Sequence, residues 1–160
     1  MNEHSADFRQ LRLLALAIPA ALLGGAYLSQ YVFGLFPCEM CWWQRYPHFV
    51  ALLFALLAYI AQPKGLWVAL AALSIFVSGA IGGFHAGVEY GWWEGLTACS
   101  LPTFGSSGNA LDAIMNAPVI RCDEAPWDLF GISLAGWNFL ISCGGALLVA
   151  LLMLRARKTA

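Results

Sequence analysis

The chain has 160 residues, of which 61% are hydrophobic and 11% are charged, and its formal net charge is -1. Ordinary soluble domains carry about 25% charged residues, so the composition excludes that class. The length suits a single domain, residues 1–160, and the chain has no basic run that would indicate a nucleic-acid partner.

Four long apolar segments follow one another along the chain, at about residues 11–33, 43–61, 66–85 and 133–154. Each approaches the roughly 20 residues that cross a bilayer as a helix. The short linker at residues 62–65 forces the second and third segments into an antiparallel hairpin. The first segment is longer than the apolar core of a signal peptide, so we expect it to be retained. The sequence therefore predicts an all-α integral membrane protein, a four-transmembrane-helix bundle.

Basic residues orient this bundle. Two of them, Arg45 and Arg121, fall on one side of a four-span protein. The other six fall on the opposite side: Arg9, Arg12, Lys64, Arg155, Arg157 and Lys158. Because positive charge stays in the cytoplasm, we expect both termini there. Two loops then face outward, at about residues 34–42 and 86–132.

The first outward loop carries the motif Cys38-Glu39-Met40-Cys41, with Arg45 four residues further on. A disulfide across so short a loop restricts the unfolded chain very little, so a structural staple is a weak explanation. Short Cys-x-x-Cys loops instead tune thiol pKa and reduction potential. At the edge of a membrane span, the pair suggests electron transfer between thiols and a lipid-soluble molecule.

The second outward loop carries Cys99 and Cys122, which we expect in the same oxidising compartment, where disulfides persist. The pair could staple a loop rich in glycine, serine and proline, or it could take part in redox chemistry. Four cysteines could also bind zinc, but the second pair lacks zinc-knuckle spacing, so we expect no metal. The apolar residues of the segment 109–116 fall on one helical face, which predicts a short amphipathic helix in this loop.

The third and fourth spans carry further notable residues. Gly79, Gly83 and Gly87 repeat every four residues, which favours close approach of another helix. His85 ends the third span at about the depth of Arg45, where it could be a polar cap or a functional group. Cys143 lies inside the fourth span and is expected to be a small buried hydrophobe.

Together these residues resemble the disulfide bond formation protein B family, the DsbB-type quinone reductases of bacterial inner membranes. The resemblance covers nearly the whole chain and includes the Cys-x-x-Cys-x-x-x-Arg motif and the distant second cysteine pair. It also includes three local runs: Phe84-His85-Ala86-Gly87-Val88-Glu89, Cys122-Asp123-Glu124 and Gly136-Trp137-Asn138.

The resemblance implies a membrane thiol:quinone oxidoreductase that sustains disulfide bond formation in secreted proteins. A periplasmic thioredoxin-fold oxidase of the DsbA type would be reoxidised by the Cys99–Cys122 disulfide, with Cys99 forming the mixed disulfide. Electrons would pass by thiol–disulfide exchange to Cys38 and Cys41, and from the Cys41 thiolate to a quinone, ubiquinone in preference to menaquinone. The protein would be a multi-pass protein of the bacterial inner membrane.

The same resemblance gives Arg45 and His85 a place beside the quinone. A guanidinium that keeps its proton could stabilise both a thiolate and the charge that develops on a quinone oxygen. Arg45 would share a helical face with Cys41 if the second span has begun there. The alternative role for Arg45 is an interfacial snorkelling anchor. Glu89, one turn after His85, could orient that ring or remain in solvent.

Two other interpretations remain open. A vitamin K epoxide reductase-like oxidant also joins four helices, a quinone and cysteine pairs, but its active dithiol follows its loop cysteines, whereas here the dithiol comes first. A disulfide-stapled membrane scaffold or transporter subunit would have no enzymatic thiols. It predicts that Cys38→Ser leaves thiol oxidation intact.

Overall fold

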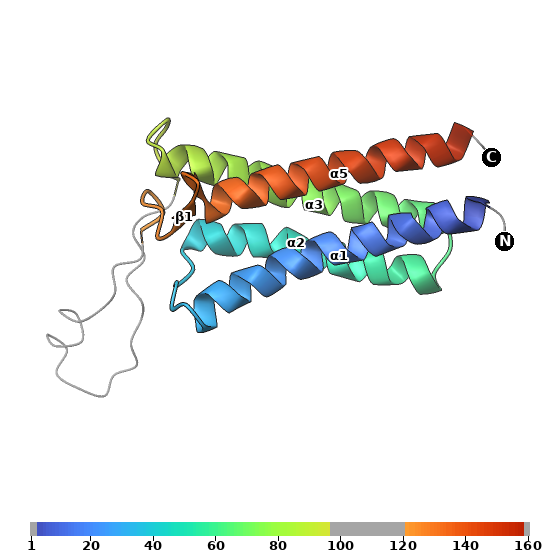
Figure 1. Ribbon diagram of the computed structural model, residues 1–160, viewed down its shortest axis with the longest axis horizontal. Coiled ribbons are helices and arrows are strands. Elements are labelled where there is room, and N and C mark those ends of the chain that lie inside the picture. The colour runs from blue at the N-terminus through green and yellow to red at the C-terminus, as the bar shows by residue number, and fades with distance from the viewer. Residues whose placement is uncertain (1–2, 97–120, 159–160) are drawn as a thin grey trace, which may run out of the picture.

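The computed structural model describes residues 3–96 and 121–158, and most of this chain is helical (Figure 1). The elements in chain order are α1 (Glu3–Tyr31), α2 (Glu39–Ile60), α3 (Lys64–Glu89), β1 (Asp128–Leu129), β2 (Ile132–Ser133) and α5 (Leu134–Lys158). The two short strands pair antiparallel just before α5. Cys99 and the amphipathic helix predicted at residues 109–116 lie outside the described residues.

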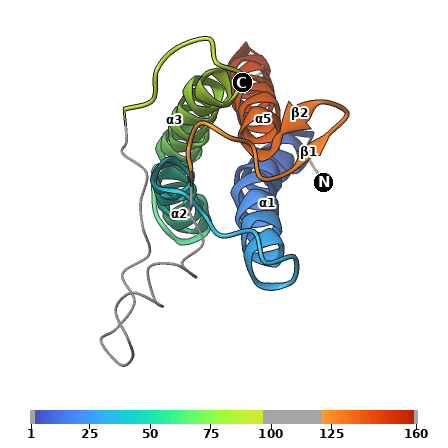
Figure 2. The same ribbon diagram turned by 90° about the vertical axis from the view of Figure 1, so that its left-hand side faces the viewer.

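The four helices pack side by side in a bundle (Figures 1 and 2). α3 lies between α2 and α5, and α1 packs against α2 and α5 on the other side. Both termini lie at one end of the bundle, together with the turn between α2 and α3 (Figure 1). The connection from α1 to α2 and the strand β1 lie at the opposite end, where the cysteine motif begins.

The outer surface of the bundle is apolar. Within the described residues, three helices are long and apolar enough to cross a membrane: Phe8–Tyr31, Lys64–Glu89 and Leu134–Ala156. α2, which has polar residues in its first half, is not among them. Large apolar side chains such as Leu53 and Phe76 are half exposed on the bundle exterior. A lipid environment covers such a surface, and this agrees with the predicted integral membrane class.

The helices begin and end at residues that differ from the predicted ones. α2 begins at Glu39 instead of residue 43, because Cys38 caps it with a side chain that accepts a hydrogen bond from the Cys41 amide. Cys41 therefore lies in a helix and not in the predicted loop at residues 34–42. α3 continues to Glu89 instead of ending at residue 85, so the predicted loop at residues 86–132 begins too early.

Small residues bring α3 and α5 close together, as the glycine spacing predicted. A Cβ atom added at Gly79 would lie 2.7 Å from the Sγ of Cys143, and one added at Gly83 would lie 2.8 Å from the Phe139 ring. Gly87 has a different role, because it makes room for the indole of Trp93, which follows α3. Two of the three glycines thus serve helix packing.

Candidate functional site

The site begins with two sulfur atoms at the first turn of α2. The Sγ atoms of Cys38 and Cys41 lie 3.0 Å apart, and the Cys41 amide donates a hydrogen bond of 3.2 Å to the Cys38 sulfur. Cys38 is only 4% exposed. The positive end of the α2 dipole favours a thiolate at this position, which suits a reactive dithiol.

The two thiols differ in their surroundings. The hydrogen bond from the Cys38 thiol to Cys41, together with burial, raises the pKa of Cys38 well above its ordinary value. Cys38 therefore holds its proton at neutral pH and donates it towards the Cys41 sulfur. The hydrogen bond from the Cys38 thiol therefore stabilises a thiolate at Cys41.

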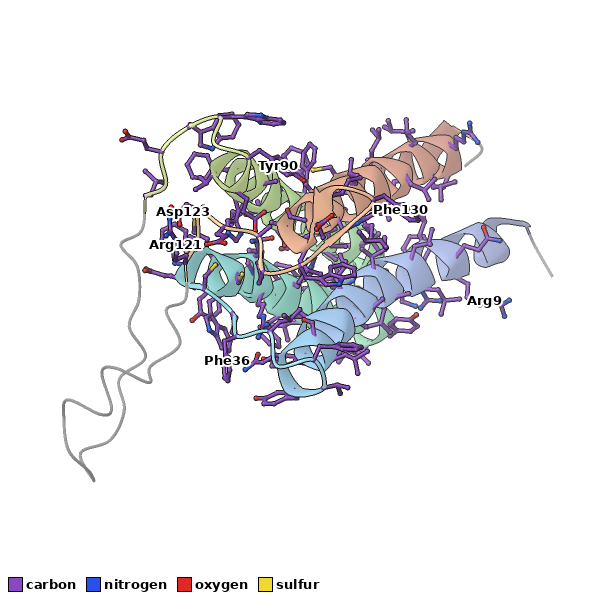
Figure 3. The ribbon with its side chains drawn as sticks, turned by 60° about the vertical axis from the view of Figure 1, so that its left-hand side comes forward. Arg9, Phe36, Tyr90, Arg121, Asp123 and Phe130 are labelled. Atoms are coloured by element: carbon purple, nitrogen blue, oxygen red, sulfur yellow. The ribbon has the colours of Figure 1, made fainter. Side chains whose placement is uncertain are left out.

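Cys122 lies beside this dithiol although it is far away in the sequence. Cys38, Met40, Val88 and Cys122 form one buried cluster, and the Cys122 side chain interacts with that of Cys38. The neighbours of Cys122 lie at this same end of the bundle (Figure 3). One of them, Arg121, makes two hydrogen bonds to Asp123, of 2.9 and 2.7 Å, which lower the pKa of that carboxyl.

Cys41 lines two cavities. The first, of about 360 Å³, opens towards the loops and is lined by polar groups that include Cys38, His85, Glu89 and Arg121. The second, of about 230 Å³, lies between α1, α2 and α5 and has mostly apolar walls. Its residues are Ala21, Leu22, Gly25, Ala26, Ser29, Leu35, Phe36, Pro37, Cys41, Gln44, Arg45, His48, Pro126, Leu134, Ala135, Trp137 and Asn138.

Arg45 lies in the wall of the apolar cavity. Its side chain donates hydrogen bonds to the Gln30 Oε1 atom at 2.6 Å and to the Ala26 carbonyl at 3.2 Å. The guanidinium also lies 4.9 Å from the ring centroids of both Tyr27 and Trp42. At 5% exposed, it is enclosed by α1 and α2, so it is not a side chain that snorkels to the membrane surface.

His85 lies at the dithiol, in the wall of the polar cavity. Its Nε2 atom is 3.6 Å from the Cys38 sulfur and 3.7 Å from the Glu89 Oε1 atom. Its Nδ1 atom lies 2.8 Å from the Gln44 Nε2 atom, an amide nitrogen that donates. The neutral ring therefore carries its proton on Nε2, the nitrogen beside Cys38 and Glu89, and His85 also makes a hydrogen bond with the Cys122 backbone. His85 does not line the cavity that contains Arg45.

Gln44 begins a chain of hydrogen bonds that crosses the bundle. Its Nε2 atom donates to the Met40 carbonyl, and its Oε1 atom accepts from the Asn138 Nδ2 atom at 2.8 Å. The Asn138 Oδ1 atom in turn lies 3.0 Å from His48 Nε2. Backbone carbonyls at Met40 and Ser78 fix both amides, since a carbonyl can only accept.

Sequence analysis missed Gln44 and His48, and it quoted Asn138 only as part of a local run. The available signal was the presence of polar residues inside predicted spans, at positions four residues apart on α2. Polar groups are costly inside a membrane and usually face the bundle interior. Gln44 and His48 are 7% and 3% exposed, in agreement with that rule.

Glu89 connects the dithiol to the start of α5. Its carboxylate accepts a short hydrogen bond from the Ser133 hydroxyl, and its side chain is 3% exposed. Of the two roles considered from the sequence, a position beside the His85 ring fits this burial, whereas a position in solvent does not. The Ser133 hydroxyl also accepts a hydrogen bond from the Gly136 amide, which anchors the first turn of α5.

The structure thus brings Cys38, Cys41, Cys122 and His85 together, and it places Arg45 in the wall of a cavity that Cys41 shares. Cys99 lies outside the described residues. One donor atom from each of Cys38, Cys41 and His85 could hold a metal ion, because the three atoms lie within 4.8 Å of one another. The same three groups are those that a thiol-exchange site needs.

Comparison with known proteins gives one consistent result. The family model described as "Disulfide bond formation protein DsbB" matches residues 8–152. Curated proteins called "Disulfide bond formation protein B" are similar to this chain. That of Verminephrobacter eiseniae is 33% identical, over 90% of this chain and 85% of its own length. The protein of Paracidovorax citrulli is 30% identical, over 98% of this chain and 92% of its own length. The protein of Marinobacter nauticus is 31% identical, over 78% of this chain and 79% of its own length. No solved structure gives a significant match.

Proposed function

This chain belongs to the DsbB family of disulfide bond formation proteins, and on that premise we propose which of its residues perform the reaction. The protein is a membrane oxidoreductase that reoxidises a DsbA-type dithiol oxidase and passes the electrons to a quinone. The proposal assigns the thiol exchange to Cys99, Cys122, Cys38 and Cys41, and the quinone site to the apolar cavity beside Arg45. It rests above all on the position of Cys41, which lines both cavities.

Exchange between the two cysteine pairs is assigned to Cys122 and Cys38. Their side chains share one buried cluster, so a Cys122 thiolate can attack the Cys38 sulfur of an oxidised Cys38–Cys41 pair. Cys41 then leaves as the thiolate, at the positive end of the α2 dipole. Cys99, by analogy with the family, takes the mixed disulfide with the soluble oxidase.

His85 is assigned a role at the sulfur atoms. Its Nε2 proton faces Cys38, and Glu89 lies on the same side of the ring. This geometry suits a hydrogen bond to sulfur whenever Cys38 carries negative charge. The family resemblance suggested that His85 contacts the quinone directly. The histidine that lines the apolar cavity is His48 and not His85, so we assign His85 to the thiol–disulfide exchange.

The apolar cavity fits a quinone ring. Its walls are mainly apolar side chains, many of them from α1 and α5, and both Arg45 and Cys41 line it. A quinone bound there supplies an acceptor for two electrons and two protons. Arg45 stabilises negative charge on the Cys41 sulfur and on a ring oxygen, and α1 holds it in place through Gln30. We assign ubiquinone in preference to menaquinone.

The proposed orientation places the dithiol end of the bundle in the periplasm and both termini in the cytoplasm of a bacterial inner membrane. Its support is the distribution of basic residues: Arg9 and Arg12 lie in the first third of α1, Lys64 begins α3 and Arg155 lies near the end of α5. These helix ends lie at the end of the bundle that carries the termini (Figure 1). The reduced soluble oxidase then reaches the second outward loop from the periplasm.

The test is quinone reduction by the purified full-length protein in detergent, followed by absorbance while a reduced DsbA-type oxidase is supplied. We expect turnover that is lost in Cys38→Ser and in Cys99→Ser, and retained in Cys143→Ser, the matched control from inside α5. Turnover that persists in Cys38→Ser would overturn the assignment. Comparison of ubiquinone with menaquinone as acceptor tests the choice between the two quinones.

A further inference from the structure

His48 is a polar residue in the wall of the apolar cavity to which the reaction outlined above gives no role. It lies on α2 one turn beyond Gln44, is 3% exposed, and contributes to the same cavity as Cys41 and Arg45. Among the residues that the structure describes, its Nδ1 atom is buried and has no hydrogen-bond partner. A buried nitrogen without a partner is costly, so its presence calls for an explanation.

The hydrogen-bond chain determines which nitrogen of His48 carries the proton. The Asn138 Nδ2 atom donates to the Gln44 Oε1 atom at 2.8 Å and to the Ser78 carbonyl at 3.2 Å, so the Oδ1 atom faces the other way. Oδ1 accepts from the Ser142 hydroxyl at 2.8 Å and from His48 Nε2 at 3.0 Å. Because an amide oxygen can only accept, the neutral His48 ring carries its proton on Nε2.

The Nδ1 atom of His48 is therefore left as a hydrogen-bond acceptor. A quinone has carbonyl oxygens, which also accept, whereas the quinol has hydroxyl groups that donate. When the dithiol becomes a disulfide, it releases two electrons and two protons, and the quinone takes up both to become the quinol. Of the two redox forms of the ligand, only the quinol can therefore donate a hydrogen bond to Nδ1.

We propose that His48, held in one tautomer by Asn138, binds a hydroxyl of the quinol and thereby makes the cavity bind quinol more tightly than a cavity without this acceptor would. Differential binding of product over substrate shifts the equilibrium on the protein towards the oxidised dithiol and the quinol. The inference rests on the proposed quinone site. It makes His48 a binding residue that distinguishes the two redox forms of the ligand.

The test measures binding without turnover. In full-length protein carrying Cys38→Ser and Cys41→Ser, decylubiquinone and decylubiquinol cannot exchange electrons with the dithiol, and their dissociation constants can be measured by calorimetry in detergent. We expect His48→Gln to weaken quinol binding about fivefold, the effect of one ordinary hydrogen bond, and to leave quinone binding within about twofold. The glutamine amide can still donate to Asn138 but lacks an acceptor at the Nδ1 position.

His48→Asn is the matched control, because its side-chain oxygen falls near the position of Nδ1. We expect it to keep more of the preference for quinol than His48→Gln does. Ser74→Ala, which removes a hydroxyl that bonds only within its own helix, should leave both constants unchanged. Equal weakening of both ligands in His48→Gln, or no weakening of either, would overturn the inference while the quinone site stands. If the parent protein binds neither ligand, the proposed quinone site fails as well.

Discussion

Individual residues at the dithiol differ in chemical role because their neighbours differ. Cys38 caps α2, lies beside Cys122 and donates a hydrogen bond to Cys41, whereas Cys41 faces both cavities. The sulfur that meets the second cysteine pair is thus separate from the sulfur that lines the apolar cavity.

The raised pKa of Cys38 can be tested by alkylation of the reduced protein. Its first cause is the hydrogen bond to Cys41, so Cys41→Ser should lower the pKa of Cys38 and move the midpoint of its alkylation to lower pH. Mass spectrometry of iodoacetamide-treated protein across a pH series measures this midpoint. Cys143→Ser is the control, since it lies against Gly79 away from the dithiol. An unchanged midpoint in Cys41→Ser would show that burial alone sets the pKa.

Arg45 offers a second test at the same scale. Arg45→Ala should raise the dissociation constant for quinone by roughly tenfold or more, because it removes a charged hydrogen-bond donor from the cavity wall. Gln30→Ala is the matched variant: it leaves the charge in place and removes one of the two hydrogen bonds that Arg45 donates to α1. We expect a smaller effect from Gln30→Ala in the same binding titration. Unchanged quinone affinity in Arg45→Ala would exclude Arg45 from the site.

At the scale of elements, the close packing of α3 against α2 and α5 makes the buried chain of hydrogen bonds possible. A Cβ atom added at Gly82 would lie 2.9 Å from the Ala135 carbonyl, 3.0 Å from Asn138 Nδ2 and 3.1 Å from Gln44 Oε1. Glycine here leaves the space that the two amides fill. Two glycines identified from their spacing also leave space for side chains of α5: Gly79 for Cys143 and Gly83 for Phe139.

Gly82→Ala should therefore separate the Gln44–Asn138 pair and destabilise the bundle, at a cost of about 1–3 kcal/mol for overpacking. The expected result is a lower thermal unfolding temperature in detergent, together with slower quinone reduction. Gly144→Ala is the control, because a Cβ atom at that position of α5 would have no neighbour within 4 Å. If the two variants unfold at the same temperature, the space at Gly82 has no structural role.

At the scale of the whole molecule, the ends of the bundle differ in chemistry. The dithiol, Cys122, Glu89 and the polar cavity lie at one end, and both termini and the α2–α3 turn lie at the other (Figure 1). The apolar cavity extends from the dithiol end along α1, α2 and α5. This arrangement suits the proposed function, in which thiols at one end of the bundle pass electrons to a lipid-soluble acceptor in the apolar cavity.

The orientation can be tested with a membrane-impermeant maleimide on intact spheroplasts. In a background with all five cysteines replaced by serine, Glu94→Cys should be labelled and Gln62→Cys should be protected until the membrane is permeabilised. Both parent residues are exposed and lie in segments that follow α3 and α2 respectively. The reverse labelling pattern would place the dithiol in the cytoplasm and contradict the proposed orientation.

The sequence by itself determined the class of protein, the family to which the chain belongs, the presence of four long helices and the residues of the dithiol. It also placed Arg45 one turn after Cys41, because that relation depends only on the period of a single helix. The helix ends were less well predicted. The start of α2 depends on the Cys38 side chain as a cap, and α3 ends where Tyr90 caps it through its backbone amide.

The tertiary structure alone decided which side chains of different helices meet. It placed His85 at the thiols and outside the cavity that Arg45 lines, and it joined Gln44 to Asn138 and Asn138 to His48. In a soluble helix, an apolar stripe reveals the buried face. In a membrane helix, both the lipid face and the core face are apolar, so the pattern does not fix the rotation of each helix about its axis. Here small residues and buried polar pairs fix that rotation, and their partners become known only when the helices are packed.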